Sequence, residues 1–286
     1  MEPLYRAIGH GCRAGRRQEV LVKVYRWRVD RGDEYYSTSK LGAFGADLTA
    51  LASFFERTWD RPAEELEPAV RSWLLNTAAF CLRALGRLGE AVEPMVEGLE
   101  MQRQAENWKN AAAQAGNLSE LTLTLGQASR SVEIARESVE LAERSGDAFG
   151  HLYSRTTLAD SLHAAGEMAA AETAFQKAEA LQAEWQPRYP SLYSLQGYRY
   201  CDLLLARAAP LDGSGLDRTA TEAAGAEARG LCEGVLERAR LTLTWSTGQG
   251  FLLDIALDHL SLGRAQFGLA LATGECVDEA SGELNR

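Results

Sequence analysis

The sequence has no run of about twenty apolar residues, so no segment is expected to span a bilayer. Its N-terminus, MEPLYRAIGHGCRAGRR, lacks the long apolar stretch of a secretory signal peptide. The five cysteines are odd in number, widely spaced and without any CxxC pair, so neither a disulfide framework nor a zinc knuckle is predicted. These absences favour a reduced, cytoplasmic setting.

Basic residues are too few for a nucleic-acid-binding protein. The chain of 286 residues has 30 Lys and Arg against 40 Asp and Glu, a formal net charge of −10. Nucleic-acid binding requires a basic patch that displaces counterions, and an anionic membrane surface attracts basic segments in the same way. Residues 6–31 are locally basic, which we interpret as a solvated helix face, with a docking patch for an acidic partner as the alternative.

Motifs for catalysis are also missing. The sequence contains no GxxxxGK[ST], HExxH or GxSxG. His10 and Cys12 are two residues apart and would point to different sides of a helix. Asp254, Asp258 and His259 cluster on one predicted helix and could hold a divalent ion with a distant ligand, although a solvated acidic face is the simpler interpretation. We therefore predict no catalytic residue, no metal site and no cofactor, and keep a metal-dependent enzyme using these three residues as the least favoured alternative.

What the sequence does contain is a repeat with a period of forty residues. Its signature reads ALGRLGEAV around Gly86, TLGQASRSV around Gly126 and AAGEMAAAE around Gly166 (126 − 86 = 40; 166 − 126 = 40). A fixed period of this size is typical of repeat arrays. The apolar periodicity predicts an amphipathic helix on each side of every glycine. The predicted pairs are 70–85 with 88–104, 108–125 with 128–145, and 148–165 with 168–184.

The remaining segments are predicted to be helical with interruptions. Helices are expected at 2–12, 16–30, 47–55, 190–208, about 229–245 and 251–271, with a turn at 246–250. A further helix is expected to be capped by Asp33 or Ser37 and to run to about Phe44, where Gly45 breaks it. Pro62 and Pro68 prevent a continuous helix through 59–68, and Pro94 is expected to kink its helix or mark a late start. The predicted organisation is 1–58 as degenerate hairpins, 59–69 as a linker, 70–186 as three strong repeats, and 187–286 as degenerate repeats with a mobile loop at 209–227.

Small residues recur at the positions where paired helices would be closest. With the turn glycine as the fifteenth residue of a repeat, three further positions are small in every copy. They are position eight (Ala79, Ser119, Ala159), position twenty (Ala91, Ser131, Ala171) and position twenty-seven (Gly98, Ser138, Ala178). Helix axes approach to the short end of the ~8–10 Å range only where side chains are small.

This pattern resembles the tetratricopeptide repeat family, most clearly over residues 72–184. The Trp that is usual at position four is absent, and Leu75, Ala115 and Arg155 stand there. The period is forty instead of about thirty-four, which is similar to long-helix arrays in bacterial signalling proteins. These include peptide-sensing regulators and the sensor regions of large signalling NTPases. The resemblance implies an all-α fold, a right-handed superhelical solenoid of antiparallel helix pairs.

The resemblance also implies a concave groove formed by the first helix of each hairpin. Aromatic rings mixed with amides and charges, as found at these positions, suit a bound peptide. The alternative is that each aromatic residue packs between repeats. The two-lysine carboxylate clamp of chaperone-binding members is not visible. The predicted groove residues are Trp73, Asn76, Phe80, Arg83, Asn117, Glu120, Tyr153, Thr156, Asp160, His163, Tyr193, Gln196 and Tyr200.

The function predicted from these features is non-catalytic recognition of a protein or peptide. The chain would be a scaffold or sensor region of a larger bacterial signalling protein, because the tail CVDEASGELNR cannot complete a good partner helix. An unfinished last repeat would explain the same tail. The alternative function is a free-standing regulator that changes curvature when a peptide binds.

Overall fold

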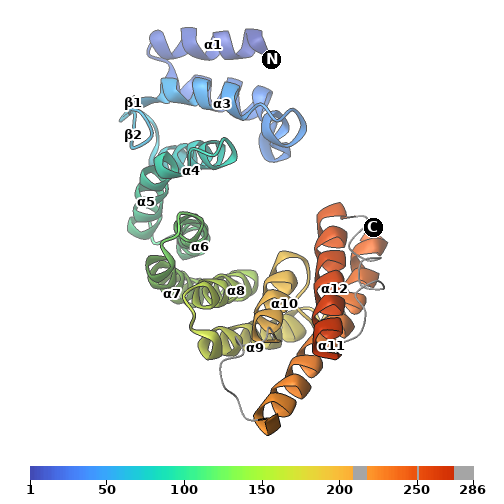
Figure 1. Cartoon of the computed structure of the whole chain (residues 1–286). Helices are drawn as coiled ribbons and strands as arrows, with labels where there is room; N and C mark the ends of the chain where they lie inside the picture. Colours follow the sequence, from blue (N-terminus) through green and yellow to red (C-terminus); the bar gives the residue numbers. More distant parts are fainter. Residues whose placement is uncertain (209–217, 250, 274–286) are drawn as a thin grey trace. The chain divides into compact units, whose positions relative to one another are not determined.

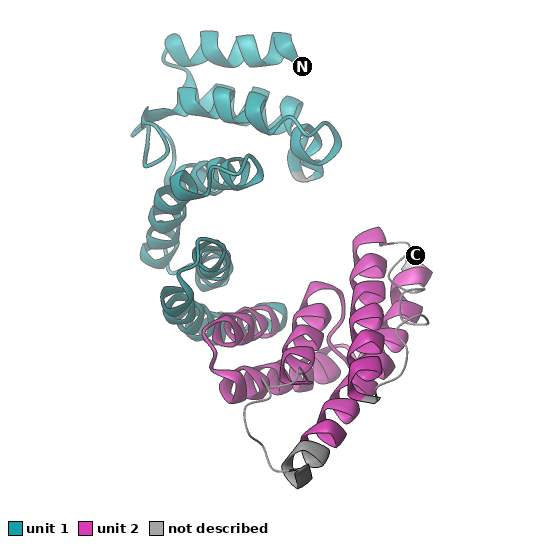
Figure 2. Ribbon diagram, viewed as in Figure 1, with its two compact units in different colours: residues 1–150 teal, residues 151–286 magenta. Residues whose placement is uncertain are grey.

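The computed structural model describes residues 1–208, 218–249 and 251–273, and most of them lie in helices (Figure 1). The predicted all-α class is therefore confirmed. The chain divides into two compact units, Met1–Gly150 and His151–Arg286 (Figure 2). The boundary falls inside the predicted block of repeats. Within the described ranges, no helix combines the length and the apolar character that crossing a membrane requires.

Unit 1 begins with short elements of several kinds. The predicted helix break at Gly45 is wrong, because this glycine lies in the first turn of α3. The predicted linker contains a two-stranded antiparallel hairpin, in which Phe55 pairs with Pro62. The elements are α1 (Glu2–Arg13), α2 (Arg17–Val20), the π-helix η1 (Leu21–Val29), the 3-10 helix η2 (Gly32–Glu34), the π-helix η3 (Tyr36–Lys40), α3 (Phe44–Leu51), the 3-10 helix η4 (Ala52–Phe54), β1 (Phe55–Arg57) and β2 (Arg61–Pro62).

The three strong repeats form the predicted helix pairs, and every helix end lies within two residues of its expected position. Pro94 does not mark a late start, because its helix begins at Leu88 and continues through it. The helices are α4 (Pro68–Ala84), α5 (Leu88–Gln104), α6 (Trp108–Thr124), α7 (Ala128–Ser145), α8 (Ala148–Ala164) and α9 (Met168–Trp185).

The three turn glycines adopt one conformation. Gly86, Gly126 and Gly166 have φ of +73°, +77° and +82°, a region that favours glycine because it has no Cβ. At Gly86, the glycine N–H donates to the carbonyl of Arg83 at 3.0 Å and the next N–H donates to the carbonyl of Leu82 at 2.9 Å. The other two turns repeat both bonds, which is the Schellman arrangement that ends a helix. The repeated motif therefore stops each first helix in the same way.

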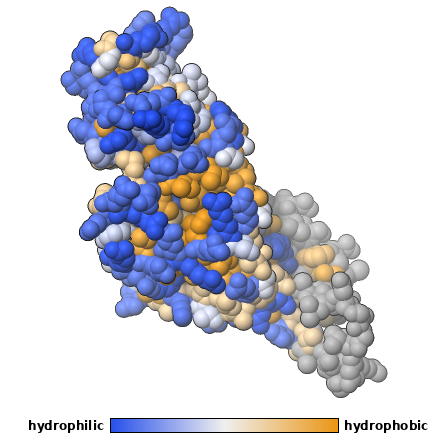
Figure 3. All heavy atoms as spheres, turned by 90° about the vertical axis from the view of Figure 1, so that its left-hand side faces the viewer, coloured by the Kyte–Doolittle hydropathy of each residue, from blue (hydrophilic) through white to orange (hydrophobic). Residues whose placement is uncertain are grey.

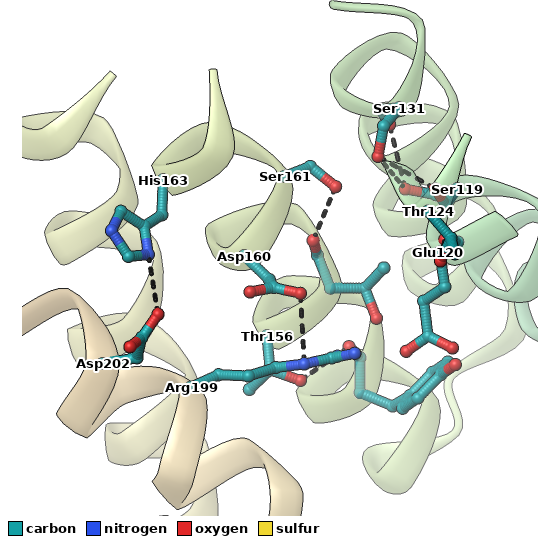
Figure 4. A network of polar contacts seen from close by, with 12 residues as sticks. Ser119, Glu120, Thr124, Ser131, Thr156, Asp160, Ser161, His163, Arg199 and Asp202 are labelled. Carbon is teal, nitrogen blue, oxygen red and sulfur yellow. Dashed lines mark hydrogen bonds and ion pairs between the residues drawn. The ribbon is translucent and has the colours of Figure 1, made fainter. Parts of the chain in front are cut away.

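The small residues at positions eight, twenty and twenty-seven are all buried, as predicted. Between α6 and α7, the Ser119 and Ser131 hydroxyls lie 3.0 Å apart, and each donates to the other residue's carbonyl at 2.9 Å (Figure 4). At Gly98, an added Cβ would lie 2.9 Å from Oε1 of Gln114. These contacts leave no room for larger side chains at the points where helices meet.

Unit 2 ends in three helices that pack on one another, α10 (Ser194–Ala208), α11 (Arg218–Gln249) and α12 (Leu252–Thr273). The loop predicted over 209–227 is wrong for 218–227, which belong to α11; 209–217 lie outside the described residues. Alanine, the strongest helix former, is frequent in this part of α11 and outweighs its small polar residues. The turn predicted at 246–250 is likewise helical to Gln249, while residue 250 and the tail 274–286 lie outside the described residues.

A fully buried carboxylate connects the first elements of unit 1. Asp47 on α3 accepts hydrogen bonds from the hydroxyls of Tyr5 on α1, Tyr25 on η1 at 3.0 Å and Ser37 on η3 at 2.6 Å. Ser37 therefore donates to a carboxylate instead of capping the next helix, one of its predicted roles. Burial and the charge of Asp47 raise the pKa of Tyr25, so its hydroxyl stays a donor. Three donors offset the cost of burying this charge.

The face drawn in Figure 3 carries mostly hydrophilic residues, with an area of hydrophobic residues between them.

Replacing Asp47 with alanine is expected to lower the free energy of unfolding by about 3 kcal/mol, because three hydroxyls lose a shared acceptor. Urea denaturation followed by circular dichroism measures this change. Glu64→Ala, at an exposed carboxylate, is the control and should change stability by less than about 0.5 kcal/mol. Equal effects of the two substitutions would show that Asp47 does not hold these elements together.

Replacing Gly126 with alanine is expected to lower the free energy of unfolding by about 1 kcal/mol, since the new Cβ must be accommodated at φ +77°. The control is Gly89→Ala in the first turn of α5, where the φ is ordinary and no atom lies within 4 Å of the added Cβ. That change should stabilise the helix by about 0.5–1 kcal/mol. Thermal unfolding of both variants checks the opposite signs.

Candidate functional site

A pocket of about 760 Å³ lies in unit 1 among α4, α5, α6 and the segment from η1 to η3. Side chains from α4 and α6 recur there at helical spacing, for example Trp73, Phe80 and Arg83, so they share one face of their helix. The lining residues are Tyr25, Asp30, Tyr35, Thr38, Ser39, Trp73, Asn76, Thr77, Ala79, Phe80, Arg83, Ala84, Leu88, Met95, Asn117, Glu120, Leu121 and Thr124.

This pocket contains every groove residue that was predicted from the first two strong repeats. The resemblance to the tetratricopeptide repeat family, applied in the register of the repeat, predicts them on one face of each of two helices. Whether they bind a ligand stays a prediction. The six residues are Trp73, Asn76, Phe80, Arg83, Asn117 and Glu120.

The pocket aromatics pack against neighbouring rings and also face the open space. Trp73 meets the ring of Tyr25 edge-on at a centroid distance of 6.0 Å, and the Arg26 guanidinium lies 5.8 Å from the Trp73 ring. Phe80 meets Phe44 edge-on at 5.8 Å but remains 52% exposed. Packing and access to a ligand are therefore combined in the same side chains, so the two interpretations of these aromatics do not exclude each other.

Polar groups in the pocket differ in how far they are already engaged. Arg83 on α4 and Glu120 on α6 form an ion pair at 3.8 Å across the pocket wall. Asn76 is exposed, and none of the residues that the structure describes hydrogen-bonds its side chain. Its amide is thus available to a ligand, as both donor and acceptor.

The repeat pattern does not predict the part of the pocket lining that comes from the N-terminal segment. Tyr25, Asp30, Tyr35, Thr38 and Ser39 belong to no repeat register, so the forty-residue period could not place them. A usable signal was the run YRWRVDRGDEYY at 25–36, in which aromatic and charged residues alternate closely. Tyrosine, tryptophan and arginine, which are frequent in this run, are enriched at protein interfaces.

Asp30 is a buried carboxylate in the pocket wall. The residue is only 3% exposed, and among the described residues its carboxylate accepts one hydrogen bond, from the Ser37 hydroxyl at 3.5 Å. Burial, and after it the charge of Asp47, raises the pKa of Asp30 to about 6. In the described part of the chain, no Lys or Arg side chain forms an ion pair with Asp30. Its negative charge is therefore held in an unfavourable place.

The backbone beside Asp30 is strained. Arg31 and Tyr35 have φ of +59° and +46°, which is uncommon for residues with a side chain, and Gly32 lies between them at +65°. Tyr35 is 50% exposed and lines the pocket. The π-helix η1 directly precedes this turn, and its last bond joins the Asp30 N–H to the Tyr25 carbonyl at 2.9 Å. Strained turns and π-helical segments occur frequently at functional sites.

Two of the predicted groove residues in unit 2 are not accessible, which corrects their assignment. Thr156 is fully buried and its hydroxyl donates to the Tyr153 carbonyl at 2.8 Å. Tyr200 is 6% exposed, stacks on Phe175 at a centroid distance of 4.9 Å, and has Arg238 4.7 Å from its ring. Both side chains are used in packing.

Other predicted residues of unit 2 form polar contacts between helices (Figure 4). Asp160 on α8 forms an ion pair with Arg199 on α10 at 3.1 Å. His163 lies 3.8 Å from Asp202, and Asp202 also pairs with Arg264 on α12 at 2.6 Å. These contacts join α8, α10 and α12, so the side chains have structural partners.

The last predicted residues, Tyr153, Tyr193 and Gln196, are partly exposed. The Tyr193 ring contacts those of Tyr189 and Trp245 at 6.0 and 6.2 Å, and its hydroxyl donates to Gln186 at 3.3 Å.

The contacts of Asp254 and Asp258 do not support the metal site that these residues could form with His259. Asp254 accepts a hydrogen bond from Ser194 at 2.7 Å, and Asp258 accepts from Thr242 at 2.6 Å and Ser246 at 3.0 Å. Hydroxyls thus already occupy one oxygen of Asp254 and both oxygens of Asp258. Across the ranges that the structure describes, no three His, Cys, Asp or Glu residues are grouped so that they could hold a metal ion.

The described cysteines are poor nucleophiles. Burial raises the pKa of Cys12 to about 11, of Cys81 to about 12 and of Cys201 to about 11, and it also raises the pKa of Cys232. These thiols are therefore protonated near neutral pH, whereas the reactive form is the thiolate. Cys276 lies outside the described residues.

Asp30→Asn is expected to raise the free energy of unfolding at about pH 7 by ~1–3 kcal/mol. The pKa of Asp30 is about 6 in the folded protein and about 4 in the unfolded chain, so ionisation of Asp30 destabilises the folded protein as pH rises between these values. The gain should vanish below about pH 4, where both states of Asp30 are protonated. Urea denaturation at several pH values measures it. A pH-independent difference between the two proteins would contradict the raised pKa.

The pocket has to be interpreted from its own residues, because no protein-family model matches the chain and no curated protein matches it. Its lining combines aromatic rings, two asparagines, two carboxylates and one guanidinium. It includes no histidine, cysteine or lysine.

Proposed function

We propose that the chain is a non-catalytic binding module whose unit 1 pocket holds a segment of a protein or peptide. The observation that carries this proposal is the convergence of six groove residues, selected by repeat register, on one pocket. Its volume of about 760 Å³ lies within the usual range for ligand pockets, ~300–1,000 Å³.

The lining offers what an extended chain needs. Asn76 and Asn117 present amides, which can donate to and accept from a peptide backbone. Trp73, Phe80 and Tyr35 present rings held in place by neighbours or by the strained turn, so little side-chain entropy is lost on binding. Aromatic residues of this kind often supply most of the binding free energy at interfaces.

The proposal extends to the fold family. Three identical helix caps forty residues apart and nine buried small residues support a tetratricopeptide-type array, with its hairpins following a right-handed superhelix. By the same resemblance, the chain serves as a scaffold or sensor region of a larger bacterial signalling protein.

Selection of random peptides displayed on phage against the full chain tests this function. Selected peptides are expected to bind Phe80→Ala and Asn117→Ala about 10-fold or more weakly, since each change removes a contact worth at least ~1.4 kcal/mol. Fluorescence anisotropy of the labelled peptides measures the affinities.

The matched controls replace similar residues outside the pocket. Phe251 is 56% exposed, close to the 52% of Phe80, and Asn110 is exposed on α6. Phe251→Ala and Asn110→Ala should leave the affinities unchanged. If every selected peptide bound the pocket variants and the controls equally well, the pocket would not be the binding site.

A further inference from the structure

The charges that line the pocket are unbalanced. Asp30 and Glu120 are acidic and Arg83 is the one basic residue in the lining, so the formal charge is −1 when both carboxylates are ionised (−2 + 1 = −1). The guanidinium of Arg83 already faces Glu120 at 3.8 Å. In the described structure, Asp30 is thus the lining carboxylate that forms no ion pair with a Lys or Arg side chain, although the charge of Arg26 acts on it.

The surroundings of Asp30 add further negative potential. Asp47 on α3 lies behind it, and both carboxylates accept from the same Ser37 hydroxyl, at 3.5 Å and 2.6 Å. The other titratable or charged groups around Asp30 are Tyr5 on α1, Tyr25 and Arg26 on η1, and Cys81 on α4. Of these, only Arg26 is cationic, and it lies over the Trp73 ring.

Aromatic rings surround the same space. Tyr25, Tyr35, Trp73 and Phe80 line the pocket together with Asp30. Two aromatic rings in this region already contact guanidinium groups of the protein itself. The Cζ atom of Arg26 lies 5.8 Å from the centroid of the Trp73 ring, and that of Arg31 lies 3.5 Å from the centroid of the Tyr36 ring. A cation between aromatic faces and a carboxylate gains from both the ring quadrupole and the opposite charge.

We propose that the segment bound in this pocket carries an arginine or lysine whose cationic group pairs with Asp30 among the aromatic rings. This inference rests on the proposed function and names the chemistry of its ligand. An acidic group would instead face two carboxylates, and a neutral group would leave Asp30 buried without an ion-pair partner.

The pairing makes binding depend on pH in a defined direction. Asp30 ionises as pH rises through about 6, so the affinity for a cationic ligand should increase between about pH 5 and about pH 7.5. Arginine keeps its charge over this whole interval. The change in affinity therefore reports on the carboxylate and not on the ligand.

The test compares two short peptides, acetyl-Gly-Arg-Gly-amide and acetyl-Gly-citrulline-Gly-amide, which differ in charge but hardly in shape. Both are titrated into the full, isotope-labelled chain, and the indole N–H signal of Trp73 is followed by NMR. The arginine peptide is expected to bind about 10- to 100-fold more tightly at about pH 7.5, as a charged hydrogen bond implies. This preference should shrink at about pH 5.

Asp30→Asn should abolish the preference for arginine, and because this variant is expected to be stabilised at neutral pH, loss of folding cannot explain the result. The matched control is Glu34→Gln, which removes an exposed carboxylate from the same segment outside the lining. It should leave the preference within about 2-fold, as expected for a screened surface charge.

The outcomes separate this inference from the function on which it rests. Equal binding of the two peptides, no binding of either at millimolar concentration, or a preference that survives Asp30→Asn would overturn the cation inference. If the selected phage peptides bound the pocket variants more weakly but were not enriched in Arg and Lys, the cation inference would also be overturned. The proposed binding function would stand in that case. Phage peptides that bind the pocket variants as tightly as the unchanged protein would overturn the function itself.

Discussion

The buried carboxylate of Asp47 is the constraint on which the N-terminal part of unit 1 depends. Three hydroxyls, from Tyr5, Tyr25 and Ser37, converge on it from three other elements. Two of these elements, η1 and η3, are π-helices with no regular repeat to fix them. Because a buried charge requires all its donors, these elements are held together in one arrangement. Five of the eighteen residues that line the pocket belong to this segment.

The same charge contributes to the feature of the pocket that is hardest to explain by folding alone. Burial, and after it the charge of Asp47, disfavours ionisation of Asp30, and no Lys or Arg side chain of the described structure forms an ion pair with it. A group that lowers stability near neutral pH is unexpected in a wall that could contain an asparagine. Titratable groups perturbed in this way are concentrated at functional sites. The strained turn at Arg31 and Tyr35 beside it suggests the same conclusion by an independent route.

The repeat period predicted the regular part of the fold because it records local chemistry. A glycine at φ above +70° is needed at every turn, and small residues are needed wherever two helices meet, so both patterns are visible in the sequence. The elements around Asp30 escaped prediction for the opposite reason. Their arrangement depends on contacts between residues far apart in the chain, such as Tyr5 with Asp47, which no local pattern encodes. The loop prediction failed for the alanine-rich residues 218–227 because their small polar residues are also typical of loops.

Equivalent positions in the repeats serve different purposes in the two units. In α4 and α6 they line a pocket, and Asn76 and Phe80 remain exposed. In α8 they face partners on the next helices, as in the pairs of Asp160 with Arg199 and of His163 with Asp202. The repeat register therefore identifies which residues share a face of a helix. Whether that face is accessible to a ligand depends on the element that packs beside it. In unit 1 the neighbour is the irregular segment held by Asp47, which adds acid and aromatic groups instead of covering the face. The chemistry of the site thus comes from the part of the chain that departs from the repeat.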